Sequence, residues 1–270
     1  MDTNYLKNIK IEYSIISRGT ERYGSKGYMG VTGPLKQKRY FVLANHYEKY
    51  AENLNDSFCF NDKYTIENIT LSRFEMITKL ALQHNLEHIK EKILIYGIGS
   101  IGFSTLIYLL DLGYKTIDVC VRGNSFRVIQ AIKKLNKKYK SSINIVDSLT
   151  ENYNTYIDAT GSSEVIEKIF KNVGNNSVIF LLGTPRDNKY LINPLDIHRK
   201  NLKIFGGHEL NGHSWRERND IFIDLLKENA NKNLKDFVTI YDCKENLNVL
   251  KKVYEKKSNF FEVIKYDIQD

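Results

Sequence analysis

The sequence predicts an α/β protein whose larger part is a doubly wound parallel sheet. From Lys92 onward, short apolar runs alternate with stretches in which apolar residues recur at helical spacing. The apolar runs are nearly continuous, which is typical of strands buried on both faces of a parallel sheet. The first run ends in a glycine-rich turn of the form G-x-G-x-x-G. These three observations together define the predicted class.

The strands and helices can be placed in order along the chain. We expect strands of the parallel sheet at 93–97, 116–121, 143–146, 155–160, 177–183 and 202–206. Helices fit between or after them at 101–112, 125–136, 163–172 and 214–229. The flanking segments predict further strands at 9–19, 38–45, 237–242 and 260–267, and helices at 69–86 and 246–257. The regular alternation of predicted strands and helices therefore begins near residue 90.

The composition indicates a folded chain. Its 270 residues are 42% hydrophobic and 27% charged, which is enough apolar material for a large core and argues against disorder. No apolar run has the length of a membrane span, and the first ten residues lack the apolar region of a secretory signal. The three cysteines (Cys59, Cys120 and Cys243) are too few and too scattered for a disulfide framework. We therefore expect a cytoplasmic protein with no membrane partner.

The formal net charge of +8 raises the question of a nucleic-acid partner. Most of the basic residues are lysines that are spread along the chain. Specific nucleic-acid readers tend instead to gather arginines and aromatic residues on one face. We therefore expect a solvated basic surface and no nucleic acid, with an anionic ligand as the other reading of the charge.

The glycine-rich turn after residue 96 predicts a dinucleotide site. Gly97 permits a tight turn, Gly99 lets the backbone approach a pyrophosphate, and Gly102 lets the helix pack close to the strand. The N–H groups of the first helical turn, which begins at Ser100 and Ile101, would then face the phosphates. Two alternatives remain open. One is a glycine turn that binds nothing, and the other is a methyltransferase, which Ile101 disfavours because a glycine usually stands there.

The end of the second strand predicts the choice of cofactor. An NAD site uses an acidic residue there to accept a hydrogen bond from the ribose 2′-OH. Arg122 stands at that place, and its planar guanidinium suits a 2′-phosphate. Asn124 and Ser125 would add hydrogen bonds, and Arg127 would add charge. We therefore expect NADP(H), the alternative being that Arg122 is only an exposed arginine and either cofactor binds weakly.

Several segments resemble the medium-chain dehydrogenase/reductase superfamily. Tyr156–Gly161 and Val178–Gly183 are similar to the fourth and fifth strands of its nucleotide-binding domain. Residues 192–207 resemble its loop into the sixth strand, and residues 237–267 resemble its return into the catalytic domain. Ile15–Glu21 resembles its first active-site segment, commonly Cys-Gly-Ser/Thr-Asp/Glu. The resemblance covers most of the chain.

The resemblance implies a Rossmann dinucleotide-binding domain at 89–231. A reduced, discontinuous GroES-like β domain, formed by 1–88 and 232–270, would carry the catalytic residues. The resemblance also implies that further residues after the fourth and fifth strands line the cofactor. These are Thr160, Gly161, Leu182, Gly183 and Thr184.

Two departures from the superfamily concern its zinc and its length. Arg18 stands where zinc members have a cysteine ligand, and no Gly-His-Glu follows in the N-terminal part. A Gly-His-Glu does occur at 207–209, where His208, Glu209 and His213 offer a remote zinc alternative. We therefore expect no metal. The N-terminal part is also short, so the substrate pocket would be open or completed by a second copy in a homodimer.

Without zinc, other groups must stabilise the developing oxyanion and supply a proton. By resemblance, Thr20 matches the hydroxyl that relays the substrate proton, with Glu21 beside it and Arg18 as a possible cation. Tyr23, Tyr28 and His46 are further candidate proton donors in the same part of the chain, although such residues more often serve packing.

The function that follows is a zinc-independent, NADP-dependent oxidoreductase. It would transfer a hydride between NADP(H) and a small carbonyl or alcohol substrate. Reduction of a C=C bond is one alternative. A non-catalytic dinucleotide-binding sensor or subunit is another, because the N-terminal part is trimmed.

Overall fold

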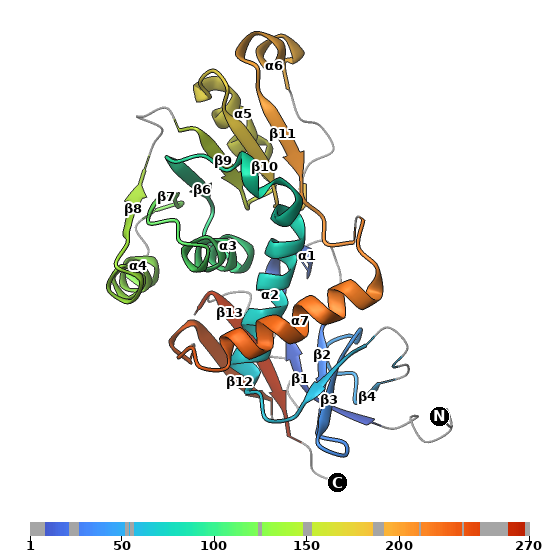
Figure 1. Ribbon diagram of the computed structural model, residues 1–270. Helices are drawn as coiled ribbons and strands as arrows, with labels where there is room; N and C mark the ends of the chain where they lie inside the picture. The colour runs from blue at the N-terminus through green and yellow to red at the C-terminus, as the bar shows by residue number, and fades with distance from the viewer. Residues whose placement is uncertain are drawn as a thin grey trace. The chain divides into compact units, whose positions relative to one another are not determined.

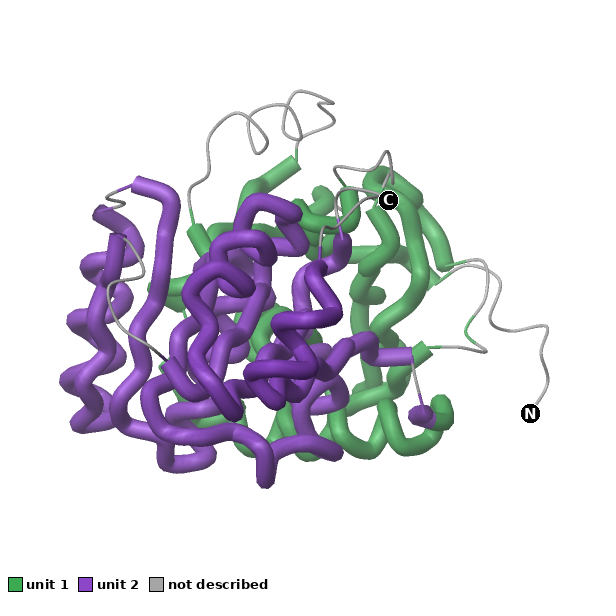
Figure 2. Tube along the Cα trace, turned by 90° about the horizontal axis from the view of Figure 1, so that it is seen from above, with its two compact units in different colours: residues 1–73, 214–270 green, residues 74–213 purple. Residues whose placement is uncertain are grey.

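The computed structural model describes residues 9–21, 27–51, 54, 57–123, 126–147, 153–185, 192–210, 212–233, 235–243 and 259–267. The chain forms two compact units (Figure 2). Unit 1 combines Met1–Arg73 with Ser214–Asp270, and unit 2 is Phe74–His213. Among the described helices, none is both long enough and apolar enough to cross a bilayer.

Unit 2 contains a six-stranded sheet in which every neighbouring pair is parallel (Figure 1). Its strands are β6 (Ile93–Tyr96), β7 (Thr116–Cys120), β8 (Ser142–Val146), β9 (Thr155–Asp158), β10 (Val178–Leu181) and β11 (Lys203–Gly206). All six predicted strands are therefore present. The strand order is β11-β10-β9-β6-β7-β8, so the chain builds outward from β6 to β8 and then returns to place β9 on the other side of β6.

The helices of unit 2 connect these strands. They are α3 (Ser100–Asp111), α4 (Phe126–Tyr139), α5 (Ser163–Asn172) and α6 (Pro194–Lys200). The first three were predicted within a few residues of these bounds. Helix α3 is buried from Gly102 to Leu110, as expected for a helix that is apolar around its whole surface. Helix α5 instead buries one face, because Ile166, Ile169 and Phe170 lie on the same side.

Helix α6 was not predicted. It has only seven residues and no buried side chain, so no apolar stripe marks it in the sequence. Local chemistry starts it: Pro194 occupies the first turn, and the side chain of Asn193 accepts a hydrogen bond from the Leu195 N–H. Asn201 ends it in the left-handed region, at φ 50°.

Unit 1 is built on a seven-stranded mixed sheet of order β12-β13-β1-β2-β3-β5, with β4 paired to β1. Its strands are β1 (Ile9–Ile15), β2 (Gly30–Thr32), β3 (Lys38–Val42), β4 (Tyr50–Ala51), β5 (Phe58–Asn61), β12 (Val238–Cys243) and β13 (Phe261–Tyr266). Strand β13 pairs antiparallel with β1 and parallel with β12. The C-terminal residues therefore complete a sheet that the N-terminal residues begin. The predicted helix at 246–257 lies outside the described residues.

The helices of unit 1 are the single turn α1 (Arg18–Glu21) and α7 (Trp215–Asn229), with a 3-10 turn at Lys235–Phe237. Aromatic contacts attach α7 to the sheet. The rings of Trp215 and Phe58 stack with centroids 4.3 Å apart, and Phe222 packs against Phe41 and Phe58. Helix α7 therefore groups with unit 1, whereas the sequence boundary at 231 put it with the parallel sheet.

Helix α2 (Ile66–Leu82) runs on into a 3-10 helix, Gln83–His88, which together cover the predicted helix at 69–86. The boundary between the units falls inside α2, after Arg73, and not after residue 88 as expected. The sequence offers no signal for a boundary there, because α2 is one uninterrupted helix without glycine or proline.

Candidate cofactor-binding and active-site residues

The turn after β6 is set by close contacts that exclude any side chain. Gly97 has φ +83°, a conformation that favours glycine, and its N–H donates to the Cys120 carbonyl at 2.9 Å. A Cβ on Gly97 would lie 2.5 Å from Cγ2 of Thr160. A Cβ on Gly102 would lie 1.8 Å from the Gly97 carbonyl oxygen. Gly102 therefore lets α3 pack directly against the turn, as its place in the motif predicts.

Gly99 differs from these two glycines. It precedes α3 with φ −85°, which any residue can adopt, and a Cβ there would meet no atom within 4 Å. Phe103 N–H donates to the Gly99 carbonyl at 2.8 Å and forms the first bond of α3. The N–H groups of Ser100, Ile101 and Gly102 therefore precede the helical ladder, where an anion is favoured. Neither packing nor backbone strain requires glycine at 99, but close approach of a ligand would.

The loops after β6, β9 and β10 lie at the carboxyl ends of the parallel strands, which we call the glycine edge. Asp158, at the end of β9, holds the loops after β9 and β10. Its buried carboxylate accepts hydrogen bonds from Thr160 N–H (2.9 Å), Thr160 Oγ1 (2.5 Å) and Gly161 N–H (3.1 Å). Its backbone carbonyl accepts from Leu182 N–H and Gly183 N–H, both at 2.9 Å. One residue therefore fixes the loops after both β9 and β10. We did not single it out from the sequence, although an acid inside an apolar strand is a usable signal.

The loops after β9 and β10 touch through their glycines. Gly161 has φ +62°, and a Cβ there would lie 1.9 Å from the Thr184 carbonyl oxygen. A Cβ on Gly183 would lie 2.2 Å from the Gly161 nitrogen. Strand β9 lies between β6 and β10, so these loops adjoin the Gly97 turn. The edge is also where the strand order reverses, between β6 and β9, and open parallel sheets bind ligands at such points.

Arg122 follows β7, the neighbour of β6 on the other side. Its side chain is 89% exposed, and Nη2 lies 3.9 Å from Oε2 of Glu164. Lys168 makes a closer contact with Glu164, at 2.7 Å, and this hydrogen bond and charge, with a smaller effect of Arg122, lower the pKa of Glu164. Arg127 is half-buried in the first turn of α4. Asn124 and Ser125 lie outside the described residues.

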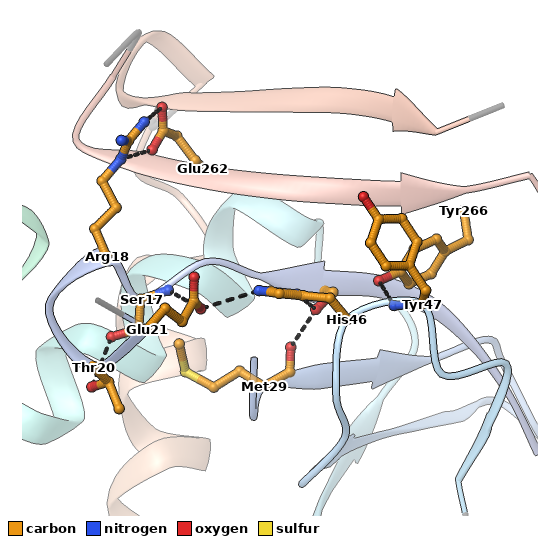
Figure 3. A network of polar contacts seen from close by, with 10 residues as sticks. Ser17, Arg18, Thr20, Glu21, Met29, His46, Tyr47, Glu262 and Tyr266 are labelled. Carbon is orange, nitrogen blue, oxygen red and sulfur yellow. Dashed lines mark hydrogen bonds and ion pairs between the residues drawn. The ribbon is translucent and has the colours of Figure 1, made fainter. Parts of the chain in front are cut away.

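In unit 1, Arg18 is engaged in an ion pair with Glu262 of β13 (Figure 3). The guanidinium contacts both carboxylate oxygens: Nη2 donates to Oε1 at 2.6 Å, and Nε donates to Oε2. The Glu262 side chain is 3% exposed. This two-point contact joins α1 to the C-terminal strand, so the geometry gives Arg18 a structural task.

Glu21 and Thr20 point to different surroundings. The Glu21 side chain is fully buried, and its Oε1 accepts from the Ser17 N–H at 2.7 Å and lies 3.3 Å from Nε2 of His46. Thr20 is exposed, and its Oγ1 is 3.3 Å from the Ser17 hydroxyl, which donates to it. Of the three predicted catalytic residues, Thr20 is exposed, Arg18 is half-buried and Glu21 is buried.

The other candidate proton donors differ in exposure. His46 is buried, Tyr28 is half-buried, and Tyr23 lies outside the described residues. Sequence reasoning did not identify Tyr266 of β13, whose hydroxyl accepts from the Tyr47 N–H at 2.8 Å. Burial raises the pKa of Tyr266 to about 12, so its hydroxyl keeps its proton at neutral pH.

The residues at the superfamily's zinc position do not fit a metal. A guanidinium cannot act as a ligand, and Arg18 is bound to Glu262. Within the described ranges, no three His, Cys, Asp or Glu side chains are grouped as a metal site would require. In the remote alternative, the His213 ring nitrogens approach Gln83 Nε2 (3.5 Å) and the Leu80 carbonyl (3.3 Å).

A family comparison agrees with this fold. The family model described as "Glucose dehydrogenase C-terminus" matches residues 67–263, and the chain belongs to this family. The resemblance to the medium-chain dehydrogenase/reductase superfamily is thereby confirmed. No curated protein matches the chain.

Solved structures share the fold at low sequence identity. A short chain alcohol dehydrogenase from E. coli CFT073, complexed with NADH, is 14% identical with a TM-score of 0.71, over 96% of this chain and 91% of that one. S. aureus TarJ in complex with NADPH is 14% identical with a TM-score of 0.65, over 98% and 93%. Glucose dehydrogenase from Haloferax mediterranei is 16% identical with a TM-score of 0.65, over 96% and 92%.

Proposed function

We propose that the protein is an oxidoreductase that transfers a hydride between NADP(H) and a small carbonyl or alcohol substrate. The observation that carries this proposal is the contrast among the glycines of the β6 turn. Gly97 and Gly102 are required by packing, whereas Gly99 faces open space beside the start of α3. A glycine that packing does not need, at the strand-order reversal of a parallel sheet, is what a bound dinucleotide would require.

The residues around this edge suit a dinucleotide. The first turn of α3, from Ser100 to Gly102, would hold the pyrophosphate, and the loops 160–161 and 182–184 would line the rest of the cofactor. Arg122 would bind the 2′-phosphate, because it is exposed and its contact with Glu164 is long. When bound, the nicotinamide supplies or accepts the hydride.

Unit 1 would be the reduced GroES-like catalytic domain that the resemblance implies. Thr20 is its candidate for the hydroxyl that relays the substrate proton, since it is exposed and a threonine hydroxyl both donates and accepts. Glu21 and Arg18 would hold the turn that carries Thr20, because their side chains are bound within unit 1. No metal ligand enters the scheme.

Fluorescence titration with NADPH and NADH tests the choice of cofactor. We expect the wild-type protein to bind NADPH more tightly. Arg122→Asp should lower the affinity for NADPH by about tenfold or more, the equivalent of one charge-assisted hydrogen bond. The variant should then bind NADH more tightly than NADPH. Arg216→Asp is the matched control, because Arg216 is an exposed arginine in the first turn of α7 in unit 1. A wild-type preference for NADH would contradict the proposal.

Turnover tests the chemistry. With NADPH and a panel of aldehydes and ketones, we expect cofactor oxidation that Thr20→Val abolishes and Thr20→Ser retains. Valine keeps the shape of threonine without its hydroxyl, whereas serine keeps the hydroxyl and loses one methyl group. Equal loss in the two variants would remove the proton relay from the scheme, and oxidation with enones alone would favour C=C reduction.

A further inference from the structure

His46 contacts three segments in the interior of unit 1, and Figure 3 shows its contact with Glu21. Its side chain is 3% exposed. Its Nδ1 lies 2.7 Å from Oγ of Ser14 in β1, and its Nε2 lies 3.3 Å from Oε1 of Glu21 in α1. The third segment is Gly27, where φ is +94° and a Cβ would lie 2.7 Å from the imidazole ring. Gly27 therefore lies against the ring and leaves no room for a side chain.

The surroundings of the ring specify where its proton lies. Oε1 of Glu21 already accepts the Ser17 N–H at 2.7 Å. Nε2 of His46 is buried and makes no aligned hydrogen bond, although Oε1 is 3.3 Å away. Without a proton on Nε2, two lone pairs would face each other in a site without water access, which is costly. A proton on Nε2 removes this repulsion.

The other side of the ring is compatible with this assignment. The Ser14 hydroxyl either donates to Nδ1, or donates to the Met29 carbonyl at 3.4 Å and accepts from Nδ1–H. The first arrangement gives a neutral imidazole and the second an imidazolium. In both, Nε2 carries a proton and lies 3.3 Å from Oε1 of Glu21.

Helix α1 depends on Glu21. It is a single turn of four residues, and a turn of this length has no stability of its own. Two bonds close it: Glu21 N–H donates to the Ser17 carbonyl at 2.9 Å, and Ser17 N–H donates to the Glu21 carboxylate. A displacement of that carboxylate would change the turn that presents Thr20.

We propose that His46 is a positioning residue, whose Nε2–H holds the Glu21 carboxylate so that α1 presents the Thr20 hydroxyl in one orientation. This assignment rests on the proposed function for the role of Thr20. It gives a task to a buried histidine and a buried glutamate that are 25 residues apart in sequence and adjoin in the fold.

A pair of isosteric variants separates the two sides of the ring. The amide nitrogen of His46→Gln can stand at the place of Nε2 and keep the donor toward Glu21. The shorter amide of His46→Asn stands near the place of Nδ1 and loses that donor. With NADPH and benzaldehyde as probe, we expect kcat to fall on the order of 10²-fold in His46→Asn, with an unchanged KM for NADPH. His46→Gln should keep most of the wild-type kcat. Glu21→Leu, which removes the oxygen that contacts both Ser17 and His46, should behave like His46→Asn.

Two measurements on the wild-type protein test the same assignment without any substitution. The ¹⁵N spectrum of the imidazole should show a protonated Nε2 in His46, with exposed His208 as internal reference. Amide exchange of Ser17 should be slow in the wild type and in His46→Gln, and fast in His46→Asn and Glu21→Leu. Melting temperatures would show whether His46→Gln and His46→Asn are comparably folded.

The outcomes distinguish the two proposals. An unprotonated Nε2, or equal kcat and equal Ser17 exchange in His46→Gln and His46→Asn, would overturn the role of His46. If the wild-type protein binds NADPH but turns over no carbonyl substrate, the proposed function fails instead. The imidazole spectrum and Ser17 exchange then still decide whether His46 holds Glu21.

Discussion

The glycine edge of unit 2 and the polar network of unit 1 are held in place by different means. At the edge, backbone atoms meet at distances that leave no room for a Cβ, as at Gly102 and Gly183. In unit 1, side chains from distant segments pair, as Arg18 does with Glu262 and His46 with Glu21. The first arrangement tolerates no added atom. The second depends on charge and on the direction of each donor. The effect of a substitution there should therefore follow the charge and hydrogen-bonding groups that it removes, and not the size of the new side chain.

Gly183→Ala gives the largest expected effect. Its Cβ would lie 2.2 Å from the Gly161 nitrogen and 2.7 Å from the backbone of Thr160, so the loops after β9 and β10 would have to separate. We expect the free energy of unfolding to fall by about 3 kcal/mol or more in urea denaturation. Gly33→Ala is the control, because its Cβ meets only the Lys10 carbonyl oxygen, at 3.9 Å. Equal stability of the two variants would contradict the backbone argument.

Asp158→Asn tests the one side chain on which the glycine edge depends. The carboxylate accepts three hydrogen bonds, and the amide that replaces it has a single acceptor oxygen. We expect a loss of about 2 kcal/mol in thermal or urea unfolding, since the one amide oxygen can serve either the two Thr160 donors or the buried Gly161 N–H, and the other side loses its partner. Asp196→Asn, on the exposed helix α6, should leave stability unchanged. An unaffected Asp158→Asn would mean that backbone packing alone forms the edge.

Arg18→Lys tests the network of unit 1 by keeping the charge and removing the planar fork. Only one of the two contacts with Glu262 can then be retained. We expect a loss of about 1–2 kcal/mol in unfolding free energy, less than for either change at the glycine edge. Arg216→Lys, at an exposed arginine, is the control. If Arg18→Lys is as stable as the wild type, charge alone holds α1 to β13.

Gly99→Ala should give the smallest effect on stability. A Cβ at this position meets no protein atom within 4 Å, and the backbone conformation suits alanine. We expect no measurable change in melting temperature, together with NADPH binding that is weaker by about tenfold or more, because the methyl group would meet the dinucleotide. Unchanged NADPH binding would contradict the proposal that the cofactor binds beside Gly99.

These differences also decide what could be predicted from the sequence. The parallel sheet was predicted strand by strand, because each strand is a short apolar run, and the central strands β6 and β9 are buried throughout. The roles of Gly97 and Gly102 followed from their spacing within one turn. Helix α6 was not predicted, because its start depends on a local cap and a proline, and it carries no apolar stripe.

The network of unit 1 was beyond this kind of reasoning. Arg18 and Glu262 are separated by 244 residues, and their pairing exists only because β13 lies beside β1. The place of α7 likewise depends on Phe222 meeting Phe41 and Phe58, which no local pattern records. We therefore assigned Arg18 and Glu21 roles from the motif, where the structure shows buried partners that the motif does not mention.

The pairing of β1 with β13 has a consequence for the order of events during translation. Strand β1 leaves the ribosome long before its partner β13, which follows only when residues 261–266 are made. At the usual speed of synthesis, the 244 residues between Arg18 and Glu262 take roughly 10 to 50 s. Unit 2 is continuous in sequence and can fold meanwhile. One edge of β1 stays open through this time, so the nascent chain passes through a stage in which an exposed strand must be kept from pairing wrongly.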